Sequence, residues 1–379
     1  MTGKERVRTA LAGGIPDKIP FGEFAVDFDT VQRILGHETY LRAKAKSRIA
    51  FWEGRRDEVV QSWEEDLVAL HRKLDCLDLV NLSPYLVPPK DYRPKPPRRV
   101  DDGTWIDDAG RVYKYSAVTA NITMVHDPTA WTRTFREEDF TQAEPLPPDP
   151  SVFEVLDHVI EDLGPEKFFL GPSGGEVGLI LLGGMERGLT EYALNPSLVE
   201  AAYRQALAEA NAKDAYYLRP GIDGVIWGQD FAYNAGPMIS PAMFRQYCLP
   251  AIEARVDNVK RHGKFVVKHA CGNNWKLLDM FVEAGYDCYQ SIQPSAGMDL
   301  SAVKERYGDR LCLWGGVAVE HLVGGTKEDV AGDVRRAVEA GAPGGRYIFG
   351  SSHSIAVGTK YDNFMTMLEE FEKRRGAYN

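Results

Sequence analysis

Short apolar runs recur along the chain, and they constrain its fold more than any other feature of the sequence. Each run spans seven residues and ends in small or polar residues. The runs lie at residues 18–24, 77–83, 168–174, 224–230, 265–271, 286–292, 311–317 and 346–352. Because their apolar residues are continuous rather than alternating, we expect strands that are buried on both faces, as in a parallel sheet.

Helical patterns separate most of these runs. Asn195-Pro196-Ser197 is typical of a helix start, and His262-Gly263 is typical of a helix end. Strands that alternate with helices predict either a (β/α)8 TIM barrel or an open, doubly wound sheet. We favour the α/β barrel, because the eight runs match its strand count and no Gly-x-Gly-x-x-Gly follows the first run. The helical patterns cover residues 150–163, 195–218, 241–261, 299–307, 327–340 and 361–375.

One stretch interrupts the alternation between the second and third runs. Residues 91–128 contain a Pro-rich segment and then two β-prone runs, at 104–106 and 112–115, with Asp-Asp-Ala-Gly between them. Turn residues between two β-prone runs predict a hairpin. We therefore expect one distorted barrel domain over residues 1–379, with a hairpin inserted near 91–128. Such an insertion covers a barrel mouth or serves as the dimerisation arm of a homodimer.

Composition and charge narrow the range of functions. The chain is 44% hydrophobic and 26% charged, as globular proteins are. A net charge of −10 argues against nucleic acid or an anionic membrane as a partner. No apolar run approaches the roughly 18 to 20 residues that span a bilayer, and no apolar signal segment follows Met1. The five scattered cysteines fit reduced thiols, so these features together predict a cytoplasmic protein.

The run at 265–271 ends in the most informative segment of the chain, His269-Ala270-Cys271-Gly272-Asn273. Side chains two residues apart on an extended backbone point to the same side. An imidazole and a thiol placed in this way suit two ligands of one zinc ion, at the strand end where α/β barrel enzymes keep their chemistry. The alternative is a buried cysteine beside a histidine whose hydrogen bonds are satisfied.

Polar and aromatic residues also follow the other runs. Because the carboxyl ends of barrel strands meet at one rim, a barrel brings these residues around one centre. Asp230 is a strong candidate for the site, since an acid after an apolar strand cannot easily be buried without a partner. The residues concerned are Glu23, Glu176, Asp230, Tyr233, Asn234, Gln290, Trp314 and His353.

Several motifs, in their order along the chain, resemble the uroporphyrinogen decarboxylase superfamily. The resemblance extends from Arg6 to about Phe371 and implies a distorted (β/α)8 barrel with an open central cleft. The motifs are Ser240-Pro241-x-Met243-Phe244, Leu249-Pro250, His262-Gly263-Lys264, His269-x-Cys271-Gly272-Asn273, Pro294-Ser295-Ala296-Gly297-Met298-Asp299-Leu300, Tyr307-Gly308, Gly344-Gly345 and Ser351-Ser352-His353-Ser354-Ile355.

The superfamily includes two chemistries, and the residues favour one. Uroporphyrinogen decarboxylases carry an Arg-rich motif after the first strand, which holds the carboxylates of the tetrapyrrole. Here residues 22–29 contain the acids Glu23, Asp27 and Asp29 and no arginine, which we interpret as repelling a polyanion. The other branch comprises zinc methyltransferases that exchange methyl groups with a corrinoid protein through a His-x-Cys … Cys pattern. His353 stands in place of that last Cys.

The resemblance implies a zinc ion held by His269, Cys271 and His353, with a corrinoid protein and a small methylated substrate as partners. One thiolate and two imidazoles leave more positive charge on zinc than two thiolates would, which favours an oxygen-bound methyl donor. We therefore expect O-demethylation of an aromatic methyl ether, with the methyl group transferred to the corrinoid cobalt. The alternatives are a methylcobamide:thiol methyltransferase, a metal-free decarboxylase or lyase of a small acid, and a non-enzymatic binder of a corrinoid partner.

Roles follow for the remaining candidates. Asp230 or Glu176 completes or orients the metal site, and Tyr233 donates a proton to the leaving oxygen. Glu176 has the alternative role of a helix cap, and Trp227 and Phe231 are alternatively core residues. The substrate-binding candidates, several of which could sandwich an arene, are Trp227, Phe231, Asn234, Gln290 and Trp314.

Overall fold

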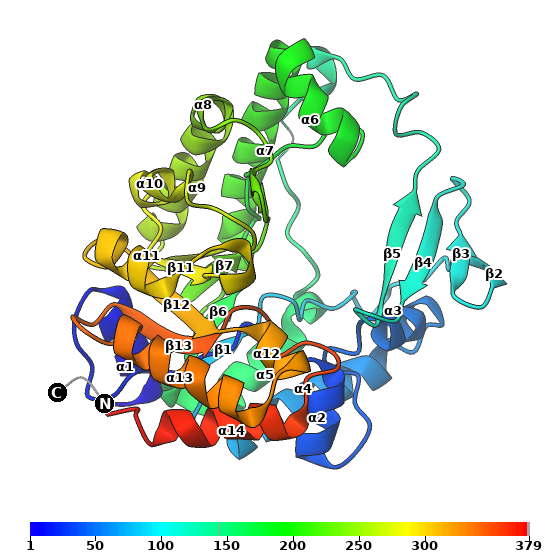
Figure 1. The fold of residues 1–379 in the computed structure, drawn as a ribbon. Helices are drawn as coiled ribbons and strands as arrows, with labels where there is room; N and C mark the ends of the chain where they lie inside the picture. Colours follow the sequence, from blue (N-terminus) through cyan, green and yellow to red (C-terminus); the bar gives the residue numbers. More distant parts are fainter. Residues whose placement is uncertain (143, 377–379) are drawn as a thin grey trace.

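A curled, seven-stranded parallel sheet forms the centre of the protein (Figure 1). The computed structural model describes residues 1–142 and 144–376. Every strand of this sheet lies within one of the predicted apolar runs, and the mixed α/β architecture is consistent with a TIM-like fold. The strand order is β1 (Leu79–Asn81), β6 (Phe168–Gly171), β7 (Gly224–Trp227), β10 (Phe265–His269), β11 (Cys288–Ser291), β12 (Cys312–Val317) and β13 (Tyr347–Ser351).

The first predicted run, residues 18–24, is not a strand in the structure. Phe21 makes an isolated parallel bridge to Phe349 of β13, and its carbonyl accepts a hydrogen bond of 2.8 Å from the amide of Asp78, just before β1. The segment thus lies between the two edge strands of the sheet, but it forms no ladder. Pro20 lacks an amide hydrogen, which limits pairing there. The expectation of eight strands is therefore not met among the described residues.

The Asp78 carboxylate ties both ends of the chain to this segment. It accepts hydrogen bonds from the Phe21 amide at 2.9 Å, from Arg6 at 3.2 Å and from Arg375 at 2.5 Å. Arg375 also donates to the carbonyl of Ile19 at 3.2 Å. The end of α14 (Tyr361–Glu372) accordingly lies close to α1 (Gly3–Leu11) in Figure 1.

Helices follow the strands and cover the sheet (Figure 1). All six predicted helical patterns are helical, although the pattern at 241–261 is divided by a π-helical turn at Phe244–Cys248. The helices are α1 (Gly3–Leu11), α2 (Phe28–Leu35), α3 (Lys44–Trp52), α4 (Arg56–Lys73), α5 (Glu154–Leu163), α6 (Met185–Leu194), α7 (Pro196–Tyr217), α8 (Pro241–Met243), α9 (Leu249–Arg261), α10 (Leu278–Glu283), α11 (Leu300–Tyr307), α12 (Val319–Gly324), α13 (Lys327–Gly341) and α14 (Tyr361–Glu372). No helix of the described chain combines the length and apolar character needed to cross a bilayer.

Alternate side chains of the strands fill the inside of the curled sheet. Because strand side chains alternate, one residue of each pair faces inward and the next faces the helices. The inward set is apolar at the starts of the strands and packs against Val7, Ala10 and Leu11 of α1. Its strand members are Leu79, Phe168, Leu170, Ile226, Val267, Cys288, Cys312, Trp314 and Ile348. This packing leaves the polar strand ends for the site.

The inserted segment is larger than the predicted hairpin. It forms a four-stranded antiparallel sheet of β2 (Arg98–Asp101), β3 (Thr104–Ile106), β4 (Val112–Ser116) and β5 (Asn121–His126), which stands beside the central sheet (Figure 1). The two β-prone runs of the sequence are β3 and β4. All four residues of β2 are exposed, so the strand carries no apolar pattern that would reveal it. A small hairpin, β8 (Ala232–Tyr233) and β9 (Gly236–Pro237), follows β7.

A buried ion pair fastens α7 and α9 to the loop after β6. The side chains of Asp214 and Arg255 are both 0% exposed, with an oxygen–nitrogen distance of 2.6 Å. Asp214 also accepts hydrogen bonds from the amide of Gly174 at 2.8 Å and from Asn258 at 2.7 Å. The carboxylate is thus fully satisfied, as a buried charge requires.

We expect Asp214→Ala to lower the free energy of unfolding by about 3–5 kcal/mol, because it leaves the Arg255 charge buried and unpaired. Asp279→Ala is the matched control. Asp279 is 60% exposed in its 3.0 Å pair with Arg306, so its loss should cost at most about 1 kcal/mol. Urea unfolding of both variants measures the difference, and equal losses would contradict the assignment of Asp214.

Candidate metal centre

His269, Cys271 and His353 come together at the carboxyl end of the sheet. His269 ends β10, Cys271 follows it, and His353 lies just after β13. Their candidate ligand atoms all lie within 4.8 Å of one another, as a group that could hold a metal ion. Cys271 Sγ is 3.5 Å from His269 Nε2, and the two imidazole rings are 5.7 Å apart at 71°. The three residues are those singled out in the sequence as zinc ligands.

The imidazole of His269 is held in the orientation that metal binding needs. Its Nδ1 is hydrogen-bonded to Gln290 Oε1, and the Gln290 amide nitrogen donates to the Ser351 carbonyl at 3.3 Å. Because Oε1 can only accept, Nδ1 carries the proton and the lone pair of Nε2 faces Cys271. Phe24 stacks on the ring at 4.2 Å. Burial lowers the pKa of His269 to about 4, so the ring is neutral and able to ligate.

The surroundings of Cys271 favour a bound cation. Its amide donates to Asp230 Oδ1 at 2.8 Å, and Ser291 Oγ lies 3.6 Å from its sulfur. Burial raises the pKa of the thiol to about 11, and the Asp230 charge adds to this. A divalent cation would offset both effects and stabilise the thiolate. A thiol with two neutral imidazoles is a donor set that fits zinc.

The buried carboxyl of Glu23 is linked to His269 through hydrogen bonds. Glu23 accepts a hydrogen bond from the Ser351 amide at 3.1 Å and another from the Ser351 hydroxyl. Burial raises the pKa of Glu23 to about 8, although both hydrogen bonds favour its charged form. Glu23, Ser351 and Gln290 therefore form a chain that ends on His269. The sequence places Glu23 at a strand end but gives no sign of this positioning role.

The backbone next to the centre is strained. Ser291 has φ 109° and Ile292 has φ 48°, conformations that residues other than glycine rarely adopt. The Ser291 hydroxyl donates to the Ser352 carbonyl at 2.8 Å, which ties the end of β11 to the segment that carries His353. Such strain is characteristic of functional sites.

The predicted catalytic residues differ in how close they lie to the centre. Asp230 is exposed, and its carboxylate accepts the hydrogen bond from the Cys271 amide. The Glu176 carboxylate lies 2.5 Å from the buried Lys268 ammonium and 2.9 Å from the Gln229 amide, and no helix begins there for it to cap. Tyr233 is 50% exposed and its hydroxyl donates to Met185 Sδ at 3.2 Å.

The predicted aromatic residues lie in the core rather than at the centre. Trp227 is buried on the outer side of β7, where its ring faces Arg255 and its indole donates to Ser173 Oγ at 2.9 Å. Phe231 is buried against Phe244, and Lys268 Nζ lies 3.9 Å from the centroid of its ring.

Trp314 points inward, but it belongs to the apolar interior and donates to the Gly22 carbonyl at 2.9 Å. None of the three aromatic rings is thus placed to sandwich an arene. Of the remaining substrate candidates, Gln290 orients His269, and Asn234 is exposed in the β8–β9 turn.

The acids of residues 22–29 do not form a repelling surface, so that interpretation of the sequence is wrong. Asp27 is buried and paired with Arg42 at 3.0 Å and Lys44 at 3.3 Å. Glu23 is buried as described, and Asp29 Oδ2 accepts a hydrogen bond from the Gly358 amide at 2.7 Å. The neutralising cations are distant in sequence, so no local motif reveals them.

Comparisons with known proteins agree with the resemblance seen in the motifs. Residues 192–374 match the model of the uroporphyrinogen decarboxylase (URO-D) family. The matched region contains all three candidate ligands. A methyltransferase from Methanosarcina mazei has the same fold, with a TM-score of 0.64 and 18% sequence identity over 98% of this chain and 99% of that chain. No curated protein matches the chain.

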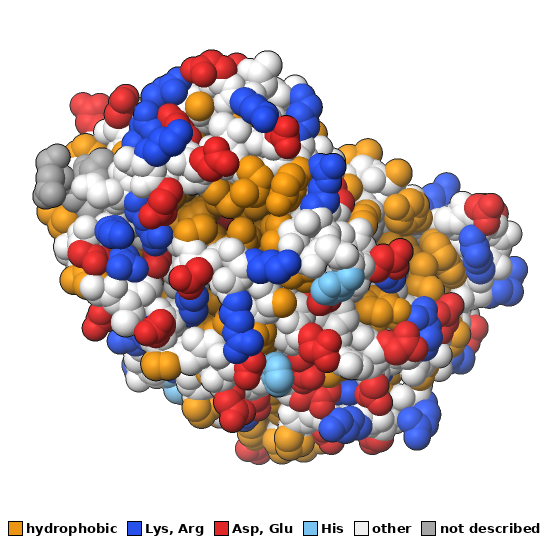
Figure 2. Space-filling view, turned by 90° about the horizontal axis from the view of Figure 1, so that it is seen from below, with side chains coloured by type: hydrophobic (Ala, Val, Ile, Leu, Met, Phe, Trp, Pro, Cys, Tyr) orange, Lys and Arg blue, Asp and Glu red, His pale blue; other side chains and the backbone are white. Residues whose placement is uncertain are grey.

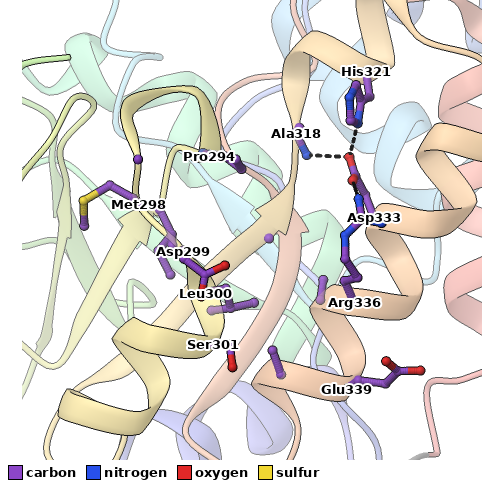
Figure 3. A pocket seen from close by; sticks show the side chains of 15 residues that line it. Pro294, Met298, Asp299, Leu300, Ser301, Ala318, His321, Asp333, Arg336 and Glu339 are labelled. Atoms are coloured by element: carbon purple, nitrogen blue, oxygen red, sulfur yellow. Dashed lines mark hydrogen bonds and ion pairs between the residues drawn. The ribbon is translucent and has the colours of Figure 1, made fainter.

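A cavity of about 550 Å3 beside α11 and α13 is separate from the metal centre (Figure 3). Asp333 accepts hydrogen bonds there from the Ala318 amide at 3.2 Å and from His321 Nδ1 at 2.8 Å, and it pairs with Arg336. These contacts fasten the turn between β12 and α12 to α13. None of the three candidate ligands lines this cavity. Its hydrogen-bonded polar groups stabilise the packing of α12 and α13.

Glu23 makes stability depend on pH. Its pKa of about 8 in the folded protein exceeds the ordinary value of 4.5, so folding retains a proton that the unfolded chain releases. The free energy of unfolding should therefore fall as pH rises from about 5 to about 8. Glu23→Gln mimics the protonated form, and its melting temperature should fall less over that range. The exposed control Glu38→Gln should keep the wild-type pH dependence; if Glu23→Gln keeps it too, Glu23 is not the group responsible.

Proposed function

We propose that the protein is a zinc-dependent methyltransferase. It moves a methyl group from a small methylated donor, in our preferred version an aromatic methyl ether, to the cobalt of a corrinoid protein. The observation that carries this proposal is the convergence of His269, Cys271 and His353, with the His269 lone pair directed at the thiol. The fold that the chain shares with a methyltransferase supports this choice of chemistry.

Zinc held by these three residues would act as a Lewis acid toward the oxygen that loses its methyl group. The chain's own residues prepare the site. Gln290 fixes the tautomer of His269, and the hydrogen bond from the Cys271 amide to Asp230 fixes the turn that carries the thiol. Asp230 is exposed beside the ligands, so in this proposal it binds or exchanges a proton with the substrate.

The other two catalytic candidates take different parts in this proposal. Glu176 is a positioning residue, because its carboxylate pairs with the ammonium of Lys268. This pair holds the strand β10, which carries His269. Tyr233 is the proton donor only if its hydroxyl leaves Met185 Sδ when the substrate binds. The half-exposed position of Tyr233 permits such a rotation.

A metal-free decarboxylase of a small acid is the second candidate, and the URO-D match favours it. In that version Asp230 and His353 exchange protons with the substrate. The metal content of the protein distinguishes the two candidates. A methylcobamide:thiol methyltransferase would contain zinc as well, but it would require a thiol acceptor.

We expect about one zinc ion per chain in tag-free protein and a loss of zinc in Cys271→Ala, because the thiolate is the only sulfur ligand of the group. Gln290→Ala should weaken zinc binding about 10- to 100-fold by freeing the His269 ring. Cys76→Ala is the control, since Cys76 lies outside the group, and it should retain zinc. Plasma mass spectrometry measures the metal, and a wild type that stays metal-free when zinc is supplied favours the decarboxylase.

Mixing the zinc-loaded protein with an aromatic methyl ether and a reduced corrinoid protein should produce methylcobamide, detected by its absorption spectrum. Cys271→Ala should abolish the reaction. Asp230→Asn, which keeps the size of the side chain, should slow it by about 100-fold if Asp230 exchanges a proton. If no methyl donor yields methylcobamide with any reduced corrinoid protein, the methyltransferase proposal is withdrawn.

A further inference from the structure

A cavity of about 380 Å3 lies between α3, α4 and the loop that follows β1. Three cations line it, Arg42, Lys44 and Arg48, together with several aromatic side chains, among them Trp52, Trp63 and Tyr85. Among the described residues, no acidic side chain is part of its lining. This composition is unusual for a chain with a net charge of −10. On the face shown in Figure 2, acidic and basic side chains are interspersed.

The positive charge of this cavity is only partly balanced. Asp27 is paired with both Arg42 and Lys44, at 3.0 and 3.3 Å, and so offsets one of the two charges. Within residues 1–142 and 144–376, Arg48 forms no ion pair, and its Nη1 donates to the Ile122 carbonyl at 2.7 Å. An unpaired guanidinium and a shared ammonium, beside apolar walls, attract an anion with an apolar body.

One of the residues that line the cavity, Arg42, contacts the segment that carries His353. Arg42 Nη2 lies 3.5 Å from Ser354 Oγ, and Ser354 is the neighbour of His353 in sequence. Arg42 itself has φ 59°, a left-handed conformation that costs energy in residues other than glycine and is often found at functional sites.

The aromatic walls pack against other rings. Trp63 packs edge-on against Phe51 and Tyr85, with ring centroids 5.8 and 5.3 Å apart. Trp52 packs against Trp105 of the inserted sheet at 5.7 Å. The volume lies within the range of about 300–1,000 Å3 typical of small-molecule sites. An aromatic ring and one carboxylate fit a space of this size and chemistry.

We propose that this cavity binds an aromatic carboxylate, with its acid group held by Arg48 and Lys44 and its ring among the aromatic walls. The substrate class named here rests on the proposed function, in which the methyl donor is an aromatic methyl ether. The donor is then a methoxylated aromatic acid. Its carboxylate pairs with the cations of α3, and its ring contacts the aromatic side chains of this cavity rather than Trp227, Phe231 or Trp314.

Isothermal titration calorimetry with para-methoxybenzoate and its uncharged counterpart para-methoxybenzyl alcohol tests the proposal without turnover. The acid should bind about 10-fold or more tightly than the alcohol, as expected for charge-assisted hydrogen bonds. Arg48→Met should weaken binding of the acid by about 10-fold or more and that of the alcohol by less than about twofold. Lys44→Met provides a second variant, in case the loss of the Ile122 contact unfolds Arg48→Met.

Lys46→Met is the matched control, because Lys46 is on the same helix but pairs with Glu38 outside the cavity. It should bind the acid as the wild type does. Equal binding of acid and alcohol, or acid binding that survives both Arg48→Met and Lys44→Met, would overturn the proposal. Acid binding without any methyl transfer would instead count against the methyltransferase and leave the carboxylate site standing.

Discussion

The alternation of side chains along β10 is the constraint on which the rest of the site depends. His269 points inward toward the centre, whereas Lys268 points outward, where its ammonium meets Glu176. Burial lowers the pKa of Lys268, and the Glu176 carboxylate opposes this effect. Because the two residues are adjacent, a shift of register by one position would place a cation in the centre and remove a ligand. The ion pair between Lys268 and Glu176 thus fixes which side chains of β10 face inward, and so directs the His269 side chain to the centre.

The same alternation explains which parts of the site the sequence could predict. Seven of the eight apolar runs contain the strands, and His269, Cys271 and His353 meet because each ends or follows a strand. A continuous apolar run, however, does not show which of its residues face inward. Trp227 was therefore expected at the site, although its pleat position directs it toward α9.

Other features depend on contacts between distant segments. Asp27 is neutralised by Arg42 and Lys44, so the acids after the first run do not form the negative surface that the sequence suggested. Only the folded chain brings these groups together. The burial of Glu23 depends on Ser351, more than 300 residues further along the chain. The exposed strand β2 has no apolar pattern, so the sequence indicated a hairpin where four strands form.

The contacts of Asp78 with Arg6 and Arg375 have a consequence for the stability of the sheet. The segment around Phe21 is held on one side by β13 and on the other by Asp78, so the sheet is complete only when the last strand and helix are present. Until those residues are in place, the edge of β1 that faces the Phe21 segment lacks part of its neighbours. Closure of the sheet therefore depends on segments from both ends of the described chain, so we expect truncation of either end to destabilise the whole sheet and not only the part removed.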